Sequence, residues 1–281
     1  MTRPRPAAFD AFAAAYDHDF TATTLGRLLR RRVWRLLHGA FPPGSHVLEL
    51  ACGTGVDAVW LAHRGVRVTA TDGSPAMVDV TRARLIAENV EHLVSAECRS
   101  LQQLAATQWP AQPPFDGAFS NFGGLNTVPH LSSLASSLAR AVRPGGRLVL
   151  VPMGPFCPWE LLWYLAHGDL VTALRRFRQP ATARIGDQSI AIWYPRLRHL
   201  RRAFTPLFRH HATYSLGLWL PPSYLGHLVE RFPRLFQRLN RLEAATARRT
   251  AGWGDHYVSV FERTLTPSNR SSMRSPSRAA G

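Results

Sequence analysis

The sequence predicts a doubly wound α/β fold, in which a mostly parallel β-sheet is covered by helices on both faces. Three observations support this prediction: short apolar runs alternate with helical periodicity, a glycine loop follows the first run, and no apolar stretch approaches the ~20 residues of a membrane span. The 281 residues suffice for one substantial core and are too few for two ordinary enzyme domains. We therefore expect one domain with insertions.

A helical lead occupies residues 1–45, ahead of the first expected strand. Apolar side chains recur at helical spacing over residues 9–38, and Pro42-Pro43-Gly44 ends the pattern. The short apolar run 46–50 is typical of a strand buried in a parallel sheet. After it we expect strands at 66–71, 92–96, 115–120 and 147–151, with helices at 74–88 and 131–142.

The second half of the chain is less regular. We expect two helical cap insertions, at residues 155–187 and 219–254, within a core domain that spans 46–265. The Ser- and Arg-rich residues 266–281 are predicted to be a disordered tail. The expected elements are helices at 159–178, 197–204 and 222–249, with strands at 189–194, 211–218 and 255–263.

The chain is strongly basic, with a formal net charge of +16, and all 34 of its basic residues are arginines. This bias fits GC-rich coding pressure as well as a nucleic-acid surface, although such a charge still attracts phosphates or an anionic membrane. Cys52, Cys98 and Cys157 lie far apart, which predicts reduced structural thiols and no metal site. The N-terminus lacks the apolar centre of a secretory signal, so we expect a cytoplasmic protein.

The glycine loop 53–55 lies between an expected strand and helix, where backbone N–H groups can approach a ligand. Alone, residues 53–58 also fit a nicotinamide-binding pattern. Glu49 separates the two cofactors, because a carboxylate here favours the ammonium of a methionine moiety and repels a pyrophosphate. Asp72 ends the second strand, where a carboxylate can accept hydrogen bonds from both ribose hydroxyls.

Polar or turn residues also flank the next three strands. Glu97 offers an acceptor for an adenine amino group, and Cys98 offers a backbone N–H for a ring nitrogen. Asn121 follows the fourth strand, and the turn Pro144-Gly145-Gly146 precedes the fifth. This ordered set favours S-adenosylmethionine over a nicotinamide.

In these motifs the chain resembles class I S-adenosylmethionine-dependent methyltransferases of the small-molecule type. The resemblance covers residues 47–151 and the closing strand, and Glu97 departs from the commoner aspartate. It implies a seven-stranded sheet with a reversed last strand, and S-adenosylmethionine as cofactor. Tyr16 is expected to cover the cofactor, with helix packing as the alternative. The implied cofactor-binding residues are Tyr16, Glu49, Ala51, Gly53, Gly55, Asp72, Gly73, Met77, Glu97, Cys98 and Asn121.

Two histidines are candidate catalytic bases. Methyl transfer from a sulfonium is an in-line displacement, so positioning of the acceptor and exclusion of water can supply most of the acceleration. His256, at the start of the reversed strand, and His130, after the fourth strand, could each accept a proton from a hydroxyl. The alternative for both is a structural, hydrogen-bonded histidine.

Aromatic segments after the fifth strand indicate a hydrophobic acceptor. Residues 153–164 and 218–224 are rich in Met, Phe, Trp and Tyr, which suit either pocket walls or ordinary cap packing. Arginines in the neighbouring helices could also rest on an anionic membrane as a peripheral contact. The sequence gives no oligomeric state.

We therefore predict methyl transfer to a hydrophobic or aromatic small molecule, such as a natural product or isoprenoid lipid. A nucleic-acid methyltransferase is one alternative, but residues 121–124 lack the Asn/Asp-Pro-Pro-aromatic motif that holds a flipped base, so a nucleic-acid partner is disfavoured. A non-catalytic regulator that binds S-adenosylmethionine is another alternative.

Overall fold

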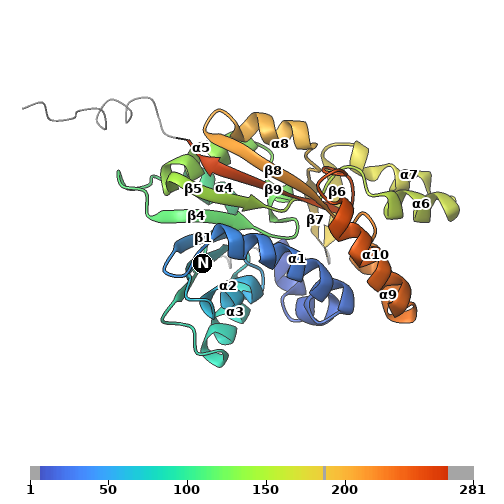
Figure 1. Ribbon diagram of the computed structural model, residues 1–281, viewed down its shortest axis with the longest axis horizontal. Helices are drawn as coiled ribbons and strands as arrows, with labels where there is room; N and C mark the ends of the chain where they lie inside the picture. The colour runs from blue at the N-terminus through green and yellow to red at the C-terminus, as the bar shows by residue number, and fades with distance from the viewer. Residues whose placement is uncertain (1–6, 186–187, 265–281) are drawn as a thin grey trace, which may run out of the picture.

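A seven-stranded sheet forms the centre of the computed structural model, which describes residues 7–185 and 188–264 (Figure 1). The strand order is β3-β2-β1-β4-β5-β9-β8. Strand β9 runs antiparallel to both β5 and β8, whereas the other neighbours are parallel, which confirms the predicted sheet with its reversed last strand. The strands are β1 His46–Leu50, β2 Arg67–Asp72, β3 Val94–Cys98, β4 Phe115–Ser120, β5 Val142–Leu150, β8 Phe208–Leu216 and β9 His256–Arg263.

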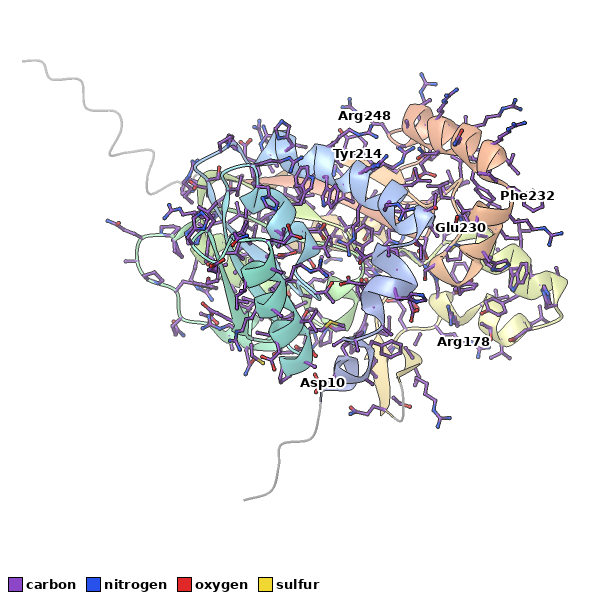
Figure 2. The ribbon with its side chains drawn as sticks, turned by 90° about the horizontal axis from the view of Figure 1, so that it is seen from below. Asp10, Arg178, Tyr214, Glu230, Phe232 and Arg248 are labelled. Atoms are coloured by element: carbon purple, nitrogen blue, oxygen red, sulfur yellow. The ribbon has the colours of Figure 1, made fainter. Side chains whose placement is uncertain are left out.

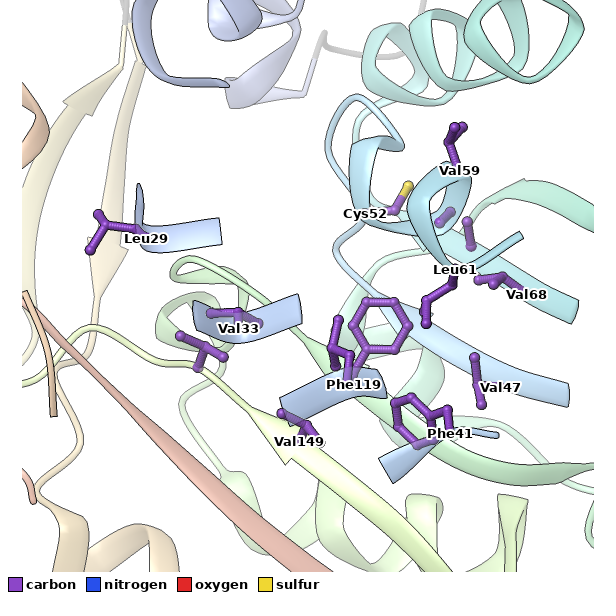
Figure 3. Close-up of a cluster of buried hydrophobic side chains, with 14 of the residues drawn as sticks. Leu29, Val33, Phe41, Val47, Cys52, Val59, Leu61, Val68, Phe119 and Val149 are labelled. Atoms are coloured by element: carbon purple, nitrogen blue, oxygen red, sulfur yellow. The ribbon is translucent and has the colours of Figure 1, made fainter. Parts of the chain in front are cut away.

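Helices cover both faces of the sheet, because each face buries its own apolar cluster. Neighbouring residues of β1 point to opposite faces: Val47 packs in the first cluster and Leu48 in the second. The first cluster is shown in Figure 3. Its helices are α1 Thr24–Ala40, α2 Val56–Ala62, α3 Pro75–Ala87, α9 His227–Arg231 and α10 Pro233–Thr246. The second cluster is covered by α4 Leu101–Ala106, α5 Leu131–Ala141 and α8 Leu197–Phe204.

Helix α1 lies across the sheet through an apolar stripe. The Thr23 side chain accepts a hydrogen bond from the Gly26 N–H and caps the helix. Leu29, Val33 and Leu37 then follow at four-residue spacing and are almost completely buried. The predicted lead over residues 9–38 is therefore not one helix, because two short turns, Ala8–Phe12 and Asp17–Thr21, precede α1.

Both predicted cap helices are broken where backbone geometry ends a helix. Gly168 adopts a φ of +74°, and Asp169 caps a new turn, so residues 159–178 form α6 Pro158–Ala166, α7 Leu170–Ala173 and a turn at Arg175–Phe177. Pro233 starts α10 at its first turn, separating it from α9.

Within the predicted helical insertion at 155–187, the part after the expected helix 159–178 contains a strand. Residues Ala181–Ile185 form strand β6, which pairs antiparallel with β7 Gln188–Ile192 in a separate two-stranded sheet. Strand β5 starts at Val142, before the predicted residue 147. Val142 already pairs with β4, and residues 143–146 form a bulge before the pairing resumes.

The predicted tail 266–281 lies outside the described residues. Within 7–185 and 188–264, no helix combines the length and apolarity that crossing a bilayer requires.

Candidate functional site

A cavity of about 640 Å³ opens where β1, β2 and β4 end. Its walls come from the segments that follow these strands, where ligands bind in open α/β sheets. Among the predicted cofactor residues, the cavity brings together Tyr16, Ala51, Gly53, Asp72, Gly73, Met77 and Asn121.

The glycine loop turns from β1 into α2 through left-handed backbone conformations. Ala51 has a φ of +55°, Gly53 of +56° and Gly55 of +76°. Ala51 and the cavity-lining Phe122 (φ +46°) are two of the three non-glycine residues with positive φ among those the structure describes. This concentration of strained backbone at one cavity is typical of a functional site.

The structure requires glycine at positions 53 and 55 for different reasons. A Cβ on Gly53 would meet no atom within 4 Å, because this position faces the cavity. A Cβ on Gly55 would lie 2.6 Å from Cγ2 of Thr81 on α3, and Gly55 does not line the cavity. Gly53 therefore keeps ligand space open, and Gly55 permits close packing of the loop on α3.

We expect Gly53→Ala and Gly55→Ala to separate ligand binding from stability. Gly53→Ala should raise the Kd for S-adenosylmethionine roughly tenfold or more, with a loss of about 1 kcal/mol in the free energy of unfolding. Gly55→Ala should cost about 2–3 kcal/mol, because strain adds to overpacking. Calorimetric titration and urea denaturation measure the two quantities. Unchanged binding by Gly53→Ala would contradict the placement of the ligand against this loop.

Asp72 ties the loop to β2. Its carboxylate accepts hydrogen bonds from the Gly53 N–H (2.9 Å) and the Ser74 N–H (2.9 Å). Burial raises the pKa of Asp72, although these N–H donors oppose the shift. The Asp72 carboxylate therefore lies at the edge of the cavity, at the end of β2, where a ribose-binding acid was predicted from the sequence.

A buried ion pair forms the polar floor of the cavity. Arg30 from α1 and Asp57 from α2 are 5% and 3% exposed, and Arg30 Nη1 donates to Asp57 Oδ2 at 2.5 Å. Asn121 Nδ2 donates to the same oxygen (2.9 Å), and Trp34 Nε1 donates to Oδ1 (2.6 Å). Neither Arg30 nor Asp57 was among the site residues predicted from the sequence. For Arg30, the available signal was its charge next to the apolar helix positions 29 and 33.

Buried polar atoms without partners gather around this floor. Within the described residues they include Arg30 Nε, Asn121 Oδ1, Glu49 Oε2 and Ser120 Oγ. Each such atom costs about 1–3 kcal/mol when left unsatisfied. Of these four residues Arg30 and Asn121 line the cavity, so their unused atoms suit a polar ligand that supplies one acceptor and one donor.

Glu49 lies beneath the cavity and does not line it. It is 1% exposed, and burial, reinforced by the nearby Asp57 charge, raises its pKa well above the usual value. The expected role of Glu49 opposite an ammonium stays a prediction; its carboxyl group lies beneath the cavity, where burial favours the neutral form.

The N-terminal turns close over the glycine loop. Asp17 accepts a hydrogen bond from Thr54 Oγ1 (2.7 Å) and pairs with Arg84 of α3. Asp10 accepts a hydrogen bond from Ser74 Oγ. These contacts hold Tyr16 against the cavity, next to Arg30, as the resemblance implies for a residue that covers the cofactor.

The β6–β7 hairpin forms the apolar wall opposite the loop. Ile190, Ile192 and Trp193 line the cavity together with Met153 and Phe9. Of the apolar and aromatic residues predicted as pocket walls, Met153 lines this cavity and the others do not. Trp159, for example, donates to the Leu218 carbonyl, and Phe156 packs edge-on against Trp253.

The remaining predicted site residues lie outside the cavity lining. Glu97 and Cys98 end β3, where Glu97 pairs with Arg99 at 3.3 Å and Cys98 is exposed; Ser100 and Leu101 line the cavity instead. His130 is exposed at the start of α5.

His256 lies behind the cavity wall. Its ring packs edge-on against Phe122, with centroids 5.7 Å apart, and its backbone bridges to Met153; both neighbours line the cavity. Its Nδ1 lies 3.0 Å from Asp255 Oδ2. This placement favours the structural alternative for His256 over a direct contact with the acceptor.

The strand order, the loop and the acid at the end of β2 together define a class I methyltransferase fold. Residues 47–146 match the family model described as a methyltransferase domain. A demethylmenaquinone methyltransferase from Mycobacterium sp. (strain KMS) is 37% identical over 145 residues, 50% of this chain and 56% of that protein. The chain thus spans little more than half the length of this relative.

Solved structures share the fold at low sequence identity. A SAM-dependent methyltransferase from Methanosarcina mazei has a TM-score of 0.56 and 16% identity, covering 82% of this chain and 98% of that one. Geranyl diphosphate C-methyltransferase from Streptomyces coelicolor A3(2) has a TM-score of 0.56 and 16% identity, covering 93% and 83%. Residues 47–146 therefore match a methyltransferase domain, and the fold is that of class I methyltransferases, in agreement with the predicted family and its cofactor.

The polar atoms of the cavity fit the amino-acid end of S-adenosylmethionine. Arg30 Nε is an unused donor for a carboxylate, and Asn121 Oδ1 is an unused acceptor for an ammonium. Asp72 lies on the ribose side, and Met77 offers an apolar surface beyond it. The residues present therefore match the chemistry of the cofactor along one wall of the cavity.

Proposed function

We propose that this protein transfers a methyl group from S-adenosylmethionine to a hydrophobic small-molecule acceptor. One observation carries the proposal: a single cavity has a polar floor, with unused polar atoms on Arg30 and Asn121, and an apolar wall on the β6–β7 hairpin. The bound cofactor supplies the electrophilic methyl group. The chain binds both partners, orients the acceptor and excludes water, which suits an in-line displacement.

The acceptor we propose to test first is demethylmenaquinone, by similarity to the mycobacterial relative. The apolar wall of Ile190, Ile192 and Trp193 suits an acceptor with a flat or isoprenoid apolar part. Among the residues that the structure describes, no histidine lines this cavity, so we propose that positioning, rather than a histidine base, supplies the acceleration.

We also propose that the protein meets its acceptor at an anionic membrane surface. Exposed apolar side chains gather on the helical insertions at one end of the molecule (Figure 1), where Figure 2 labels Phe232 and Arg178. Arg178, Arg234 and Arg238 are exposed among them, which suits anionic headgroups. The exposed apolar residues are Leu162, Leu165, Leu170, Val171, Leu174 and Phe177 on the first insertion, and Phe232, Leu235 and Leu242 on the second. A cytoplasmic location stays a prediction of the sequence.

One experiment tests both proposals. Labelled S-adenosylmethionine is incubated with the protein and demethylmenaquinone in vesicles of phosphatidylcholine, with or without phosphatidylglycerol. We expect labelled quinone, formed faster in the anionic vesicles. Cofactor binding without label in quinone, other lipid, metabolite or RNA fractions would favour a non-catalytic regulator, and equal rates in both vesicles would contradict the membrane contact.

A further inference from the structure

A second cavity, of about 540 Å³, lies on the outer face of α1 and α2, away from the proposed cofactor site. Its lining consists only of aromatic and basic residues. They are Arg31, Trp34, Arg35 and His38 from α1, Trp60 from α2, and Arg64 from the turn that follows α2.

The floor of this cavity is an ordered aromatic stack. The indoles of Trp34 and Trp60 are stacked, with centroids 5.0 Å apart and planes 12° from parallel. The Arg64 guanidinium lies 3.7 Å from the Trp60 centroid, and its Nη1 donates to the Trp60 carbonyl at 2.9 Å. Arg64 is therefore held in place by the floor and does not need an anion to order it.

The two α1 arginines that line this cavity, Arg31 and Arg35, lack the partners that Arg30 and Arg32 of the same helix have. Arg30 pairs with Asp57, and Arg32 donates to the Asn240 side chain. Arg31 and Arg35 are exposed, and across residues 7–185 and 188–264 neither makes an ion pair or hydrogen bond. No carboxylate is among the lining residues. The unbalanced charge favours an anion with several oxygen acceptors.

Trp34 connects this outer cavity to the proposed cofactor site. Its Nε1 donates to Asp57 Oδ1 at 2.6 Å, while the other oxygen of Asp57 accepts from Arg30 and Asn121, which line the inner cavity. A shift of the Trp34 ring therefore acts on the carboxylate that positions Arg30.

We propose that the cavity formed by Arg31, Trp34, Arg35, His38, Trp60 and Arg64 binds a phosphate group, and that its occupancy changes the affinity for S-adenosylmethionine through Trp34 and Asp57. Guanidinium forks match the geometry of phosphate oxygens. The phosphate can belong to a soluble ion or ester or to a lipid headgroup. Phosphate binding stands apart from the proposed methyl transfer, whereas the coupling rests on cofactor binding.

Calorimetric titration with inorganic phosphate, without cofactor, tests the site. We expect Arg31→Gln/Arg35→Gln to weaken binding about tenfold or more. Arg140→Gln/Arg201→Gln is a charge-matched control, because both arginines are exposed on helices of the opposite face, and it should stay within about twofold of wild type. Equal losses in both variants would show nonspecific charge attraction and overturn the proposal.

Vesicles distinguish the source of the phosphate. If inorganic phosphate fails to bind up to about 10 mM, flotation with phosphatidic acid in phosphatidylcholine becomes the deciding measurement. Binding that is lost in Arg31→Gln/Arg35→Gln and kept in the control assigns the site to a lipid headgroup. Failure of both probes, or flotation equal in the two variants, overturns the proposal.

The coupling is tested with Trp34→Phe, which replaces the indole by a smaller aromatic ring and removes the Nε1 donor. Wild type should show a shift of about threefold or more in the Kd for S-adenosylmethionine when phosphate is saturating. Trp34→Phe should lose this shift, measured at a phosphate concentration that saturates the variant according to its own phosphate Kd. A shift of equal size in Trp34→Phe, or none in wild type, would overturn the coupling.

Discussion

Replacement of Arg30 by methionine should lower the free energy of unfolding by about 3–5 kcal/mol, because it leaves Asp57 as a buried charge without a cationic partner. It should also raise the Kd for S-adenosylmethionine roughly tenfold or more, through loss of the Nε donor. Urea denaturation and calorimetric titration at pH 7 measure the two effects.

The double variant Arg30→Met/Asp57→Asn separates these two effects. The amide removes the unpaired charge but has one acceptor oxygen, which can serve either the Asn121 donor or the Trp34 donor, so part of the lost stability should return. Cofactor binding should stay weak, because Arg30 Nε is still missing. Recovery of cofactor affinity together with stability would mean that Arg30 supports the fold and does not contact the ligand.

Replacement of Arg176 by methionine should destabilise the protein by a similar amount, about 3–5 kcal/mol. Arg176 is 4% exposed and donates to Glu160 Oε2 (2.8 Å) and Asp255 Oδ1 (2.6 Å), so its loss removes a buried partner from two carboxylates and leaves Glu160 with Arg175 and Asp255 with His256. Arg175→Met is the matched control. Arg175 binds the same Glu160 with a side chain that is 40% exposed, so its loss should cost about 1 kcal/mol or less.

The Arg176 effect should depend on pH. Burial alone would raise the pKa of Glu160 and of Asp255, but the hydrogen bonds from Arg175 and Arg176 to Glu160, and the charges of His256 and Arg176 near Asp255, hold both below their usual values. A depressed carboxyl pKa stabilises the fold above the unfolded pKa of about 4 and loses this contribution as pH falls towards the folded value. The difference between wild type and Arg176→Met should therefore shrink from pH 7 to pH 3. A constant difference would assign the role of Arg176 to packing.

The sequence predicted the cofactor wall well, because its signals are local. A strand, a glycine loop and an acid at the end of the next strand meet wherever parallel strands are neighbours. Gly53, Asp72 and Asn121 therefore came together as expected. The end of β3 shows the limit of such local signals. Glu97 and Cys98, the last residues of the strand, do not line the cavity, whereas Ser100 and Leu101, two and three residues after Cys98, do.

The features missed by the sequence analysis depend on side-chain direction and on distant pairing. Arg30 and Asp57 are 27 residues apart and meet only because α1 crosses the sheet next to α2. The apolar wall of the pocket was predicted in the aromatic segments, whereas the β6–β7 hairpin supplies an apolar wall of this cavity. Gly186-Asp187 between two short strand-like runs was the available hairpin signal in the sequence.

A crystal structure with S-adenosylhomocysteine tests the central claim most directly. We predict the amino-acid carboxylate at Arg30, the ammonium at Asn121, the ribose at Asp72, and the sulfur facing the wall of Met153 and Ile192. S-adenosylhomocysteine lacks the transferred methyl group. The position of its sulfur therefore shows from where the methyl group of the donor would point into the apolar part of the cavity. A ligand bound in the reverse direction, or outside this cavity, would contradict the proposed site and the methyl transfer that we derive from it.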